Sequence, residues 1–152
     1  MNCRAPKRCW PLHVARVPPP DGLLPSFLTP MLQSPEERFV LRHARGNKVI
    51  ASFIEPAFDS ATRRRGLLGR TTFAEGAALI IAPCSGIHTF FMRMAIDVVF
   101  VSRDGRVLKT CSRLPAWRIA LAFRAFAVIE LPPGAVERSD TRRGDQLFLA
   151  VE

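Results

Sequence analysis

Short apolar runs, each bounded by glycine, proline or charged turn residues, recur along the chain from about residue 39. Runs of this length that are joined by turns rather than by helices are typical of an antiparallel sheet. Gly46-Asn47 and Asp104-Gly105 each separate two such runs, so each pair predicts a hairpin. The pattern therefore predicts a mainly β fold (β-rich α+β), a compact antiparallel sandwich or barrel of about eight short strands. The expected strands cover residues 39–43, 48–54, 78–82, 88–93, 96–101, 106–111, 126–131 and 146–151.

A change of pattern after residue 58 predicts the main helix of the domain. Asp59 or Ser60 can cap its first turn, and apolar residues such as Leu67 recur until Gly69 can end it. We therefore expect one main helix near residues 59–69, and a short helix or turn at residues 135–139.

The first 35 residues have a different composition, with eight prolines among them. Proline removes a backbone donor and interrupts both helices and sheets. We therefore predict a disordered tail over residues 1–35, followed by a single globular β-rich domain over residues 36–152. Met31 stands just before the apolar runs begin, which raises the hypothesis that translation starts there.

The formal net charge is +9, but the basic residues are not concentrated in the predicted domain. Residues 1–48 carry +5 and the remainder carries +4, whereas nucleic-acid binders usually gather their basic residues on one face of the folded domain. Nucleic acid is therefore not the expected partner. The cluster Arg63-Arg64-Arg65 leaves a weak nucleic-acid binder as an alternative.

Two absences in the sequence narrow the class of protein. No run of about 18 apolar residues occurs, so no membrane span is predicted. The four cysteines form no Cys-x-x-Cys pair, which argues for free thiols in a reducing compartment and so for a cytoplasmic protein. We expect no cofactor and no metal.

Asp97 is the most informative single residue, because it interrupts an otherwise apolar run over residues 96–101. Such a run predicts a central strand that is buried on both faces. A buried carboxylate is costly unless it is paired and hydrogen-bonded, so we predict an ion pair between Asp97 and Arg65. This pair either fixes the helix against the sheet or forms the floor of a ligand pocket. The other candidate partners are Arg70, Arg93 and His88.

Glu130 has a similar setting, because apolar residues flank it in Val128-Ile129-Glu130-Leu131. It is predicted to be a second paired acid, and Asp97 and Glu130 together could line one pocket.

Cys84 and His88 provide the alternative of an enzyme. In an extended chain these two residues share one face with Gly86, which would suit a hydrolase-like Cys–His nucleophile pair or half of a metal site. Either site needs a third group that the sequence does not identify. The structural interpretation is a core thiol and a hydrogen-bonded histidine, so we assign no catalytic residue and no metal ligand.

Seven ordered blocks of sequence carry a resemblance to a known family. Arg65-Gly66-Leu67-Leu68-Gly69-Arg70 is similar to an Arg-Gly-Leu-Met-x-Arg segment, and His88-Thr89-Phe90-Phe91-Met92 is similar to a Ser-Phe-Trp-Met block. The other blocks lie at residues 78–81, 96–100, 104–107, 128–131 and 144–145. From about Arg65 to Leu149 the chain thereby resembles the family known only as domain of unknown function 192.

The chain departs from the common pattern of this family at two places. Phe91 stands where tryptophan is usual, and Arg93-Met94-Ala95 stands where a Lys-Asn-Thr run is usual. The resemblance implies a compact, mainly β sandwich-like fold and no established activity, and a fold alone does not supply a function. We interpret the chain as a module that binds an unknown small ligand or protein. Its candidate site residues are Arg65, Asp97, Glu130 and His88.

Overall fold

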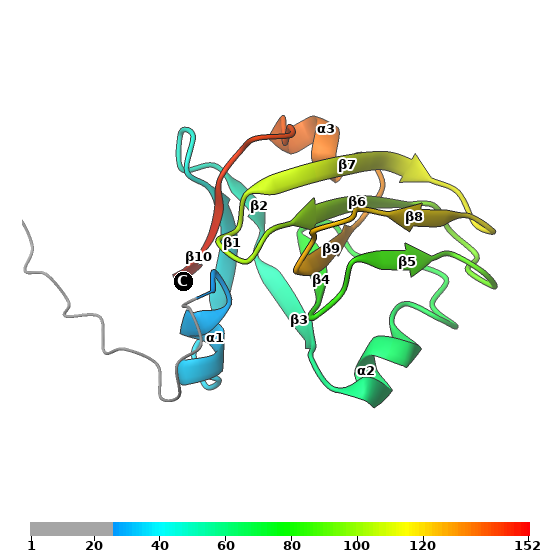
Figure 1. Ribbon diagram of the computed structural model, residues 1–152, viewed down its shortest axis with the longest axis horizontal. Coiled ribbons are helices and arrows are strands. Elements are labelled where there is room, and N and C mark those ends of the chain that lie inside the picture. Colours follow the sequence, from blue (N-terminus) through cyan, green and yellow to red (C-terminus); the bar gives the residue numbers. More distant parts are fainter. Residues whose placement is uncertain (1–25) are drawn as a thin grey trace, which may run out of the picture.

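The computed structural model describes residues 26–152. Ten strands and three short helices make up this part of the chain, and the strands form three sheets (Figure 1). The fold is therefore β-rich α+β, as the apolar runs predict. Within the described residues none of the sheets closes on itself. Of the two arrangements that the pattern predicts, the barrel is therefore wrong.

The central sheet contains five strands in the order β3-β4-β9-β6-β7. They are β3 (Phe53–Ala57), β4 (Ala77–Ile81), β9 (Ala127–Leu131), β6 (Ile96–Val101) and β7 (Val107–Leu114). All residues of β4, β6 and β9 are buried, because these runs are apolar on both faces and lie between neighbouring strands. β3 runs parallel to β4, so the prediction of a fully antiparallel sheet is wrong at this edge.

Two smaller sheets lie at opposite ends of the molecule (Figure 1). One has the order β10-β1-β2 and the other pairs β5 with β8. Their strands are β1 (Phe39–His43), β2 (Val49–Ala51), β10 (Leu147–Val151), β5 (Gly86–His88) and β8 (Ile119–Leu121). The antiparallel pairs β1–β2 and β6–β7 confirm the two predicted hairpins.

The count of ten strands differs from the predicted eight for two reasons. The run at 48–54 divides at Ser52, so that β2 and β3 belong to different sheets. β8 was not predicted, because its outward residues Ile119 and Leu121 are as apolar as Ala120 between them, which hides the alternation of a half-buried strand.

The three helices are α1 (Thr29–Gln33), α2 (Ser60–Arg65) and α3 (Ala135–Ser139). Asp59 caps α2 by accepting hydrogen bonds from the N–H groups of Ala61 and Thr62. The helix predicted near 59–69 is only six residues long, because Gly66 has φ +45° and cannot continue it. The short helix predicted at 135–139 is confirmed as α3.

Apolar side chains pack on both faces of the central sheet. Those of Val99 and Ile129 join residues from β1, β10, α1 and α3 in one cluster. Those of Val98 and Phe100 join Leu67 and Ala120 in a second cluster on the opposite face, as alternation along a strand requires. The second cluster lies beneath the segment that follows α2 and beneath β8.

Part of the predicted N-terminal tail belongs to the fold. Phe27, Leu28 and Met31 are buried in the first cluster, and the N–H of Phe27 donates to the carbonyl of Arg103. Residues 26–35 are therefore placed with the folded part rather than with the tail. Residues 1–25 of the predicted tail lie outside the described residues. A start at Met31 stays a hypothesis, and it would remove Phe27 and Leu28 from the core.

Candidate functional site

Asp97 is fully buried in β6, as its sequence setting predicts. Its Oδ1 accepts a hydrogen bond from the N–H of Arg113 (2.7 Å), and its Oδ2 accepts one from the N–H of Val136 (2.8 Å). Arg113 lies where the register between β6 and β7 shifts, and Val136 lies in the first turn of α3. Asp97 thus joins β7 and α3 to the central sheet.

The predicted ion pair between Asp97 and Arg65 is wrong. Within residues 26–152, Asp97 forms no ion pair with Arg65 or with any of the other candidate partners. The physical reason is that two backbone N–H donors already offset the desolvation of the carboxylate. Asp97 is therefore a structural residue, and the candidate site lies elsewhere.

Glu130 points to the face of the sheet opposite to that of Asp97. Glu130 pairs with Val98 and Leu131 pairs with Asp97 in the β6–β9 register, and successive residues of a strand face opposite sides. The expectation that both acids line one pocket is therefore wrong. Glu130 instead shares its face with Leu79, its partner across β4.

The Glu130 carboxyl is buried without full hydrogen bonding. The residue is 4% exposed, and its Oε2 has no hydrogen-bond partner among the described residues. Burial raises the pKa of Glu130 to about 7, against a smaller lowering by Arg70. Arg70 is engaged by Glu55, with its Nη1 and Nη2 donating to the carboxylate at 2.8 and 2.6 Å. A buried acid with a raised pKa and no partner is a candidate for function.

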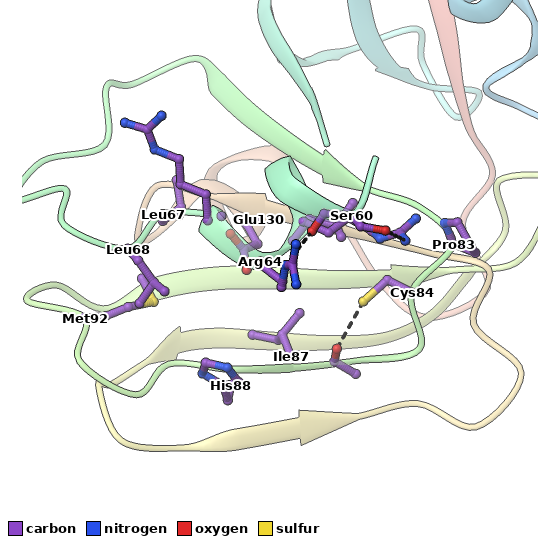
Figure 2. Close-up of a pocket in the computed structure, with 15 residues that line it drawn as sticks. Ser60, Arg64, Leu67, Leu68, Pro83, Cys84, Ile87, His88, Met92 and Glu130 are labelled. Atoms are coloured by element: carbon purple, nitrogen blue, oxygen red, sulfur yellow. Dashed lines mark hydrogen bonds between the residues drawn. The ribbon is translucent and has the colours of Figure 1, made fainter. Parts of the chain in front are cut away.

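Glu130 lies in the wall of a cavity of about 520 Å³, a volume typical of small-molecule sites (Figure 2). In Figure 2, Ile87 and His88 of β5 lie across the cavity from the strand that carries Glu130. The remaining lining residues are Ser60, Arg63, Arg64, Arg65, Gly66, Leu67, Leu68, Ile81, Pro83, Cys84, Gly86 and Met92. The cavity therefore brings together Arg65, Glu130 and His88 of the predicted site and leaves out Asp97.

Three consecutive arginines of α2 make one side of this cavity cationic. Arg63 donates to the carbonyls of Phe58 and Ala82, and Arg64 donates to the carbonyl of Ser60. None of Arg63, Arg64 and Arg65 forms an ion pair with a carboxylate of residues 26–152. These three lining residues therefore bring positive charge to the cavity without a carboxylate counter-ion in the part of the chain that the structure describes.

Comparison with known proteins places the chain in a family. The profile of DUF192 (domain of unknown function 192), which is described as an uncharacterized ACR, matches residues 41–149. The chain belongs to the domain of unknown function 192 family. The match begins earlier than the resemblance seen from residue 65, since it includes part of β1 and all of β2 and β3. No curated protein matches the chain.

Two solved structures are similar to this member of the domain of unknown function 192 family. A protein of unknown function from Novosphingobium aromaticivorans is 22% identical with a TM-score of 0.63, over 72% of this chain and 82% of that one. A protein from Sinorhizobium meliloti, described as a candidate transcription regulator, is also 22% identical with a TM-score of 0.63, over 73% of this chain and 91% of that one. At this identity the likeness concerns the fold.

Cys84 and His88 both line the cavity of this domain of unknown function 192 protein, but they do not form a nucleophile pair. The Cys84 Sγ donates to the carbonyl of Gly86 at 3.0 Å (Figure 2). Burial raises the pKa of the Cys84 thiol, which favours the unreactive protonated form. His88 is exposed, and its ring stacks on Phe90 with centroids 5.1 Å apart. Cys84 is therefore held as a thiol rather than as the activated thiolate that the enzyme alternative assigns to it.

Sequence reasoning missed the apolar wall of the cavity. Leu67 and Met92 belong to two of the seven blocks that carry the family resemblance, but nothing in one dimension places them around Glu130. Within residues 26–152, no group of three or more histidine, cysteine, aspartate or glutamate side chains is arranged to hold a metal ion. Each helix of this part is too short to cross a membrane.

Proposed function

We propose that the domain binds a small organic anion in the cavity between α2 and β5. The observation that carries the proposal concerns Glu130, which lines this cavity and whose buried Oε2 has no hydrogen-bond partner within residues 26–152. A ligand hydroxyl or amine that donates to this oxygen would relieve a desolvation cost of about 1–3 kcal/mol. The protein would thereby gain a hydrogen bond that it cannot make alone.

The charges around the cavity suggest which chemistry the other end of the ligand carries. Arg64 and Arg65 have no carboxylate counter-ion within residues 26–152, and guanidinium groups bind carboxylate and phosphate well. Leu67, Leu68 and Met92 also line the cavity and supply apolar contact. A hydroxylated carboxylate or phosphate monoester combines both features.

The free thiols of Cys84 and Cys111 support a cytoplasmic location for this binding function.

A direct experiment compares the binding of glycerol 3-phosphate with that of inorganic phosphate and of glycerol. We expect its addition to shift the amide resonances of Gly86, Ile87 and His88 in two-dimensional NMR spectra of the full chain. Its affinity should exceed that of inorganic phosphate by about tenfold, because one added hydrogen bond to a charged group is worth about 1.5 kcal/mol. Glycerol alone should bind more weakly than either.

Variants separate the two ends of the site. Glu130→Gln should abolish the advantage of glycerol 3-phosphate over inorganic phosphate, whereas the double variant Arg64→Ala/Arg65→Ala should weaken both ligands. Arg143→Ala removes an exposed arginine that does not line the cavity and should change neither affinity. If hydroxylated phosphate monoesters and hydroxy acids all leave the cavity amides unchanged, the proposal is wrong.

Nucleic acid is the second candidate partner, because α2 exposes consecutive arginines and one structural neighbour is described as a candidate transcription regulator. Binding of that kind relies on phosphate contacts and falls steeply with salt. Retention of the protein on double-stranded DNA at physiological salt, lost in the Arg64→Ala/Arg65→Ala variant but not in Glu130→Gln, would favour this function over the small anion.

A further inference from the structure

Five large apolar side chains form an exposed ridge along β8, the loops that flank it and the connection between β5 and β6. The residues of this ridge and their exposed fractions are Phe91 70%, Trp117 56%, Ile119 61%, Leu121 64% and Phe123 94%. Monomeric proteins rarely expose large contiguous apolar patches unless the patch binds something. The ridge lies with β5 and β8 at the end of the molecule away from β1 and β10 (Figure 1).

The geometry of β8 explains why the ridge faces outward. Ala120 points into the second apolar cluster, so alternation directs Ile119 and Leu121 to the opposite side. β8 pairs only with β5 within the described residues, so no further strand covers it. Within residues 26–152 the side chains of the ridge are therefore exposed.

Two aromatic residues of the ridge are held in a costly backbone conformation. Phe91 and Trp117 both have φ of 63°, a region that bulky residues avoid at a cost of about 1–3 kcal/mol each. Their rings contact edge to face, with centroids 4.7 Å apart. The strain keeps two exposed aromatic rings side by side.

The two segments that carry the ridge contain charges of a single sign. Residues 76–96 and 105–129 contain no aspartate or glutamate. Of the basic residues in these segments, Arg113 pairs with Glu137. Four others form no ion pair within residues 26–152: Arg93, Lys109, Arg118 and Arg124. Arg106 pairs with Gln146 beside β10, away from the ridge. An apolar ridge among unpaired cations is complementary to an anionic, partly apolar surface.

We infer that this ridge docks the domain on the surface of an anionic lipid membrane, with the apolar side chains entering the headgroup region. A second copy of the chain is disfavoured, because its arginines would face the same arginines. Single-stranded nucleic acid suits Trp117 and the phenylalanines but offers no apolar phase for Ile119 and Leu121. A bilayer interface accommodates tryptophan, aliphatic residues and arginine together.

Sedimentation with lipid vesicles tests the inference. The full chain should bind vesicles of phosphatidylcholine with about one third phosphatidylserine and should bind pure phosphatidylcholine poorly. The double variant Ile119→Ser/Phe123→Ser should lower the partition coefficient at least about tenfold, because two apolar groups no longer enter the interface. In a Trp10→Phe background, the fluorescence of Trp117 should shift to shorter wavelength when the anionic vesicles are added.

The matched control is Leu32→Ser/Phe53→Ser, which removes side chains of similar exposure outside the ridge and should leave the partition coefficient unchanged. Far-ultraviolet circular dichroism spectra and melting temperatures equal to those of the parent protein would show that both double variants fold. The inference is overturned if vesicle binding survives Ile119→Ser/Phe123→Ser, because attraction by other basic residues then suffices. It is also overturned if Trp117 does not shift, or if the ridge variant loses affinity for single-stranded DNA while the parent does not bind vesicles.

Discussion

Replacing Asp97 by alanine should lower the free energy of unfolding by about 3 kcal/mol, one of the two largest effects that the structure predicts for a single residue. The variant loses two hydrogen bonds to a charged acceptor. The N–H groups of Arg113 and Val136 are then left without a hydrogen-bond acceptor. Since these groups belong to β7 and α3, both elements should become less protected against amide hydrogen exchange.

Chemical denaturation of Asp97→Ala, Arg65→Ala and the double variant measures this effect. Arg65 is exposed and forms no ion pair within residues 26–152, so Arg65→Ala should change the free energy of unfolding by less than about 0.5 kcal/mol. The effects of the two changes should add. A coupling energy of about 1 kcal/mol or more between residues 65 and 97 would contradict this account and would support the ion pair that the sequence predicts.

Replacing Glu130 by glutamine should stabilise the protein by about 3 kcal/mol near pH 8, where the wild-type carboxyl is ionised in its buried position. The pKa of Glu130 is about 7 in the folded protein, against an ordinary value of 4.5. Between these values the unfolded chain has released the proton while the folded protein still holds it. The wild type therefore loses stability as pH rises from 4.5 to about 7.

The difference in unfolding free energy between Glu130→Gln and wild type isolates this contribution. His43 acts in the opposite direction, because burial lowers its pKa and so stabilises the fold as pH rises toward 6.5. That contribution is common to both proteins and cancels in the difference. We expect the advantage of Glu130→Gln to grow from pH 4.5 to 7 and then level off. An advantage that is the same at all pH values would contradict a raised Glu130 pKa.

These two acids illustrate how far sequence reasoning reaches. The apolar neighbours of Asp97 and Glu130 correctly predict that both side chains are buried. The partners of Asp97 could not be predicted, because they are backbone donors set by a register shift in β7 and by the first turn of α3. Sequence reasoning compares side chains, and it therefore predicted a basic side chain as the partner of Asp97.

The relation between the two acids depends on register. Whether residue 130 stands opposite residue 97 or residue 98 decides whether the carboxylates share a face, and a shift of one residue reverses the answer. The fold class, by contrast, follows from the apolar runs themselves, which is why the β-rich architecture and two hairpins could be predicted.

Only part of the candidate site could be predicted, because the site also depends on how elements pack together in three dimensions. Arg65, Glu130 and His88 lie on three different elements, α2, β9 and β5, and the cavity that they line exists only once these elements pack together. The ridge along β8 was missed because apolar residues at 117–123 resemble a buried segment when burial cannot be observed.

The most direct test of the account is a pH titration of the Glu130 carboxyl group. Carbon-detected NMR on the full chain records the chemical shift of its carboxyl carbon at each pH. We predict a midpoint near pH 7 that moves when a hydroxylated phosphate monoester occupies the cavity, because the ligand then donates to Oε2. A midpoint near the ordinary value of 4.5, indifferent to every such ligand, would mean that Glu130 is solvated and that the cavity is not a binding site built around it.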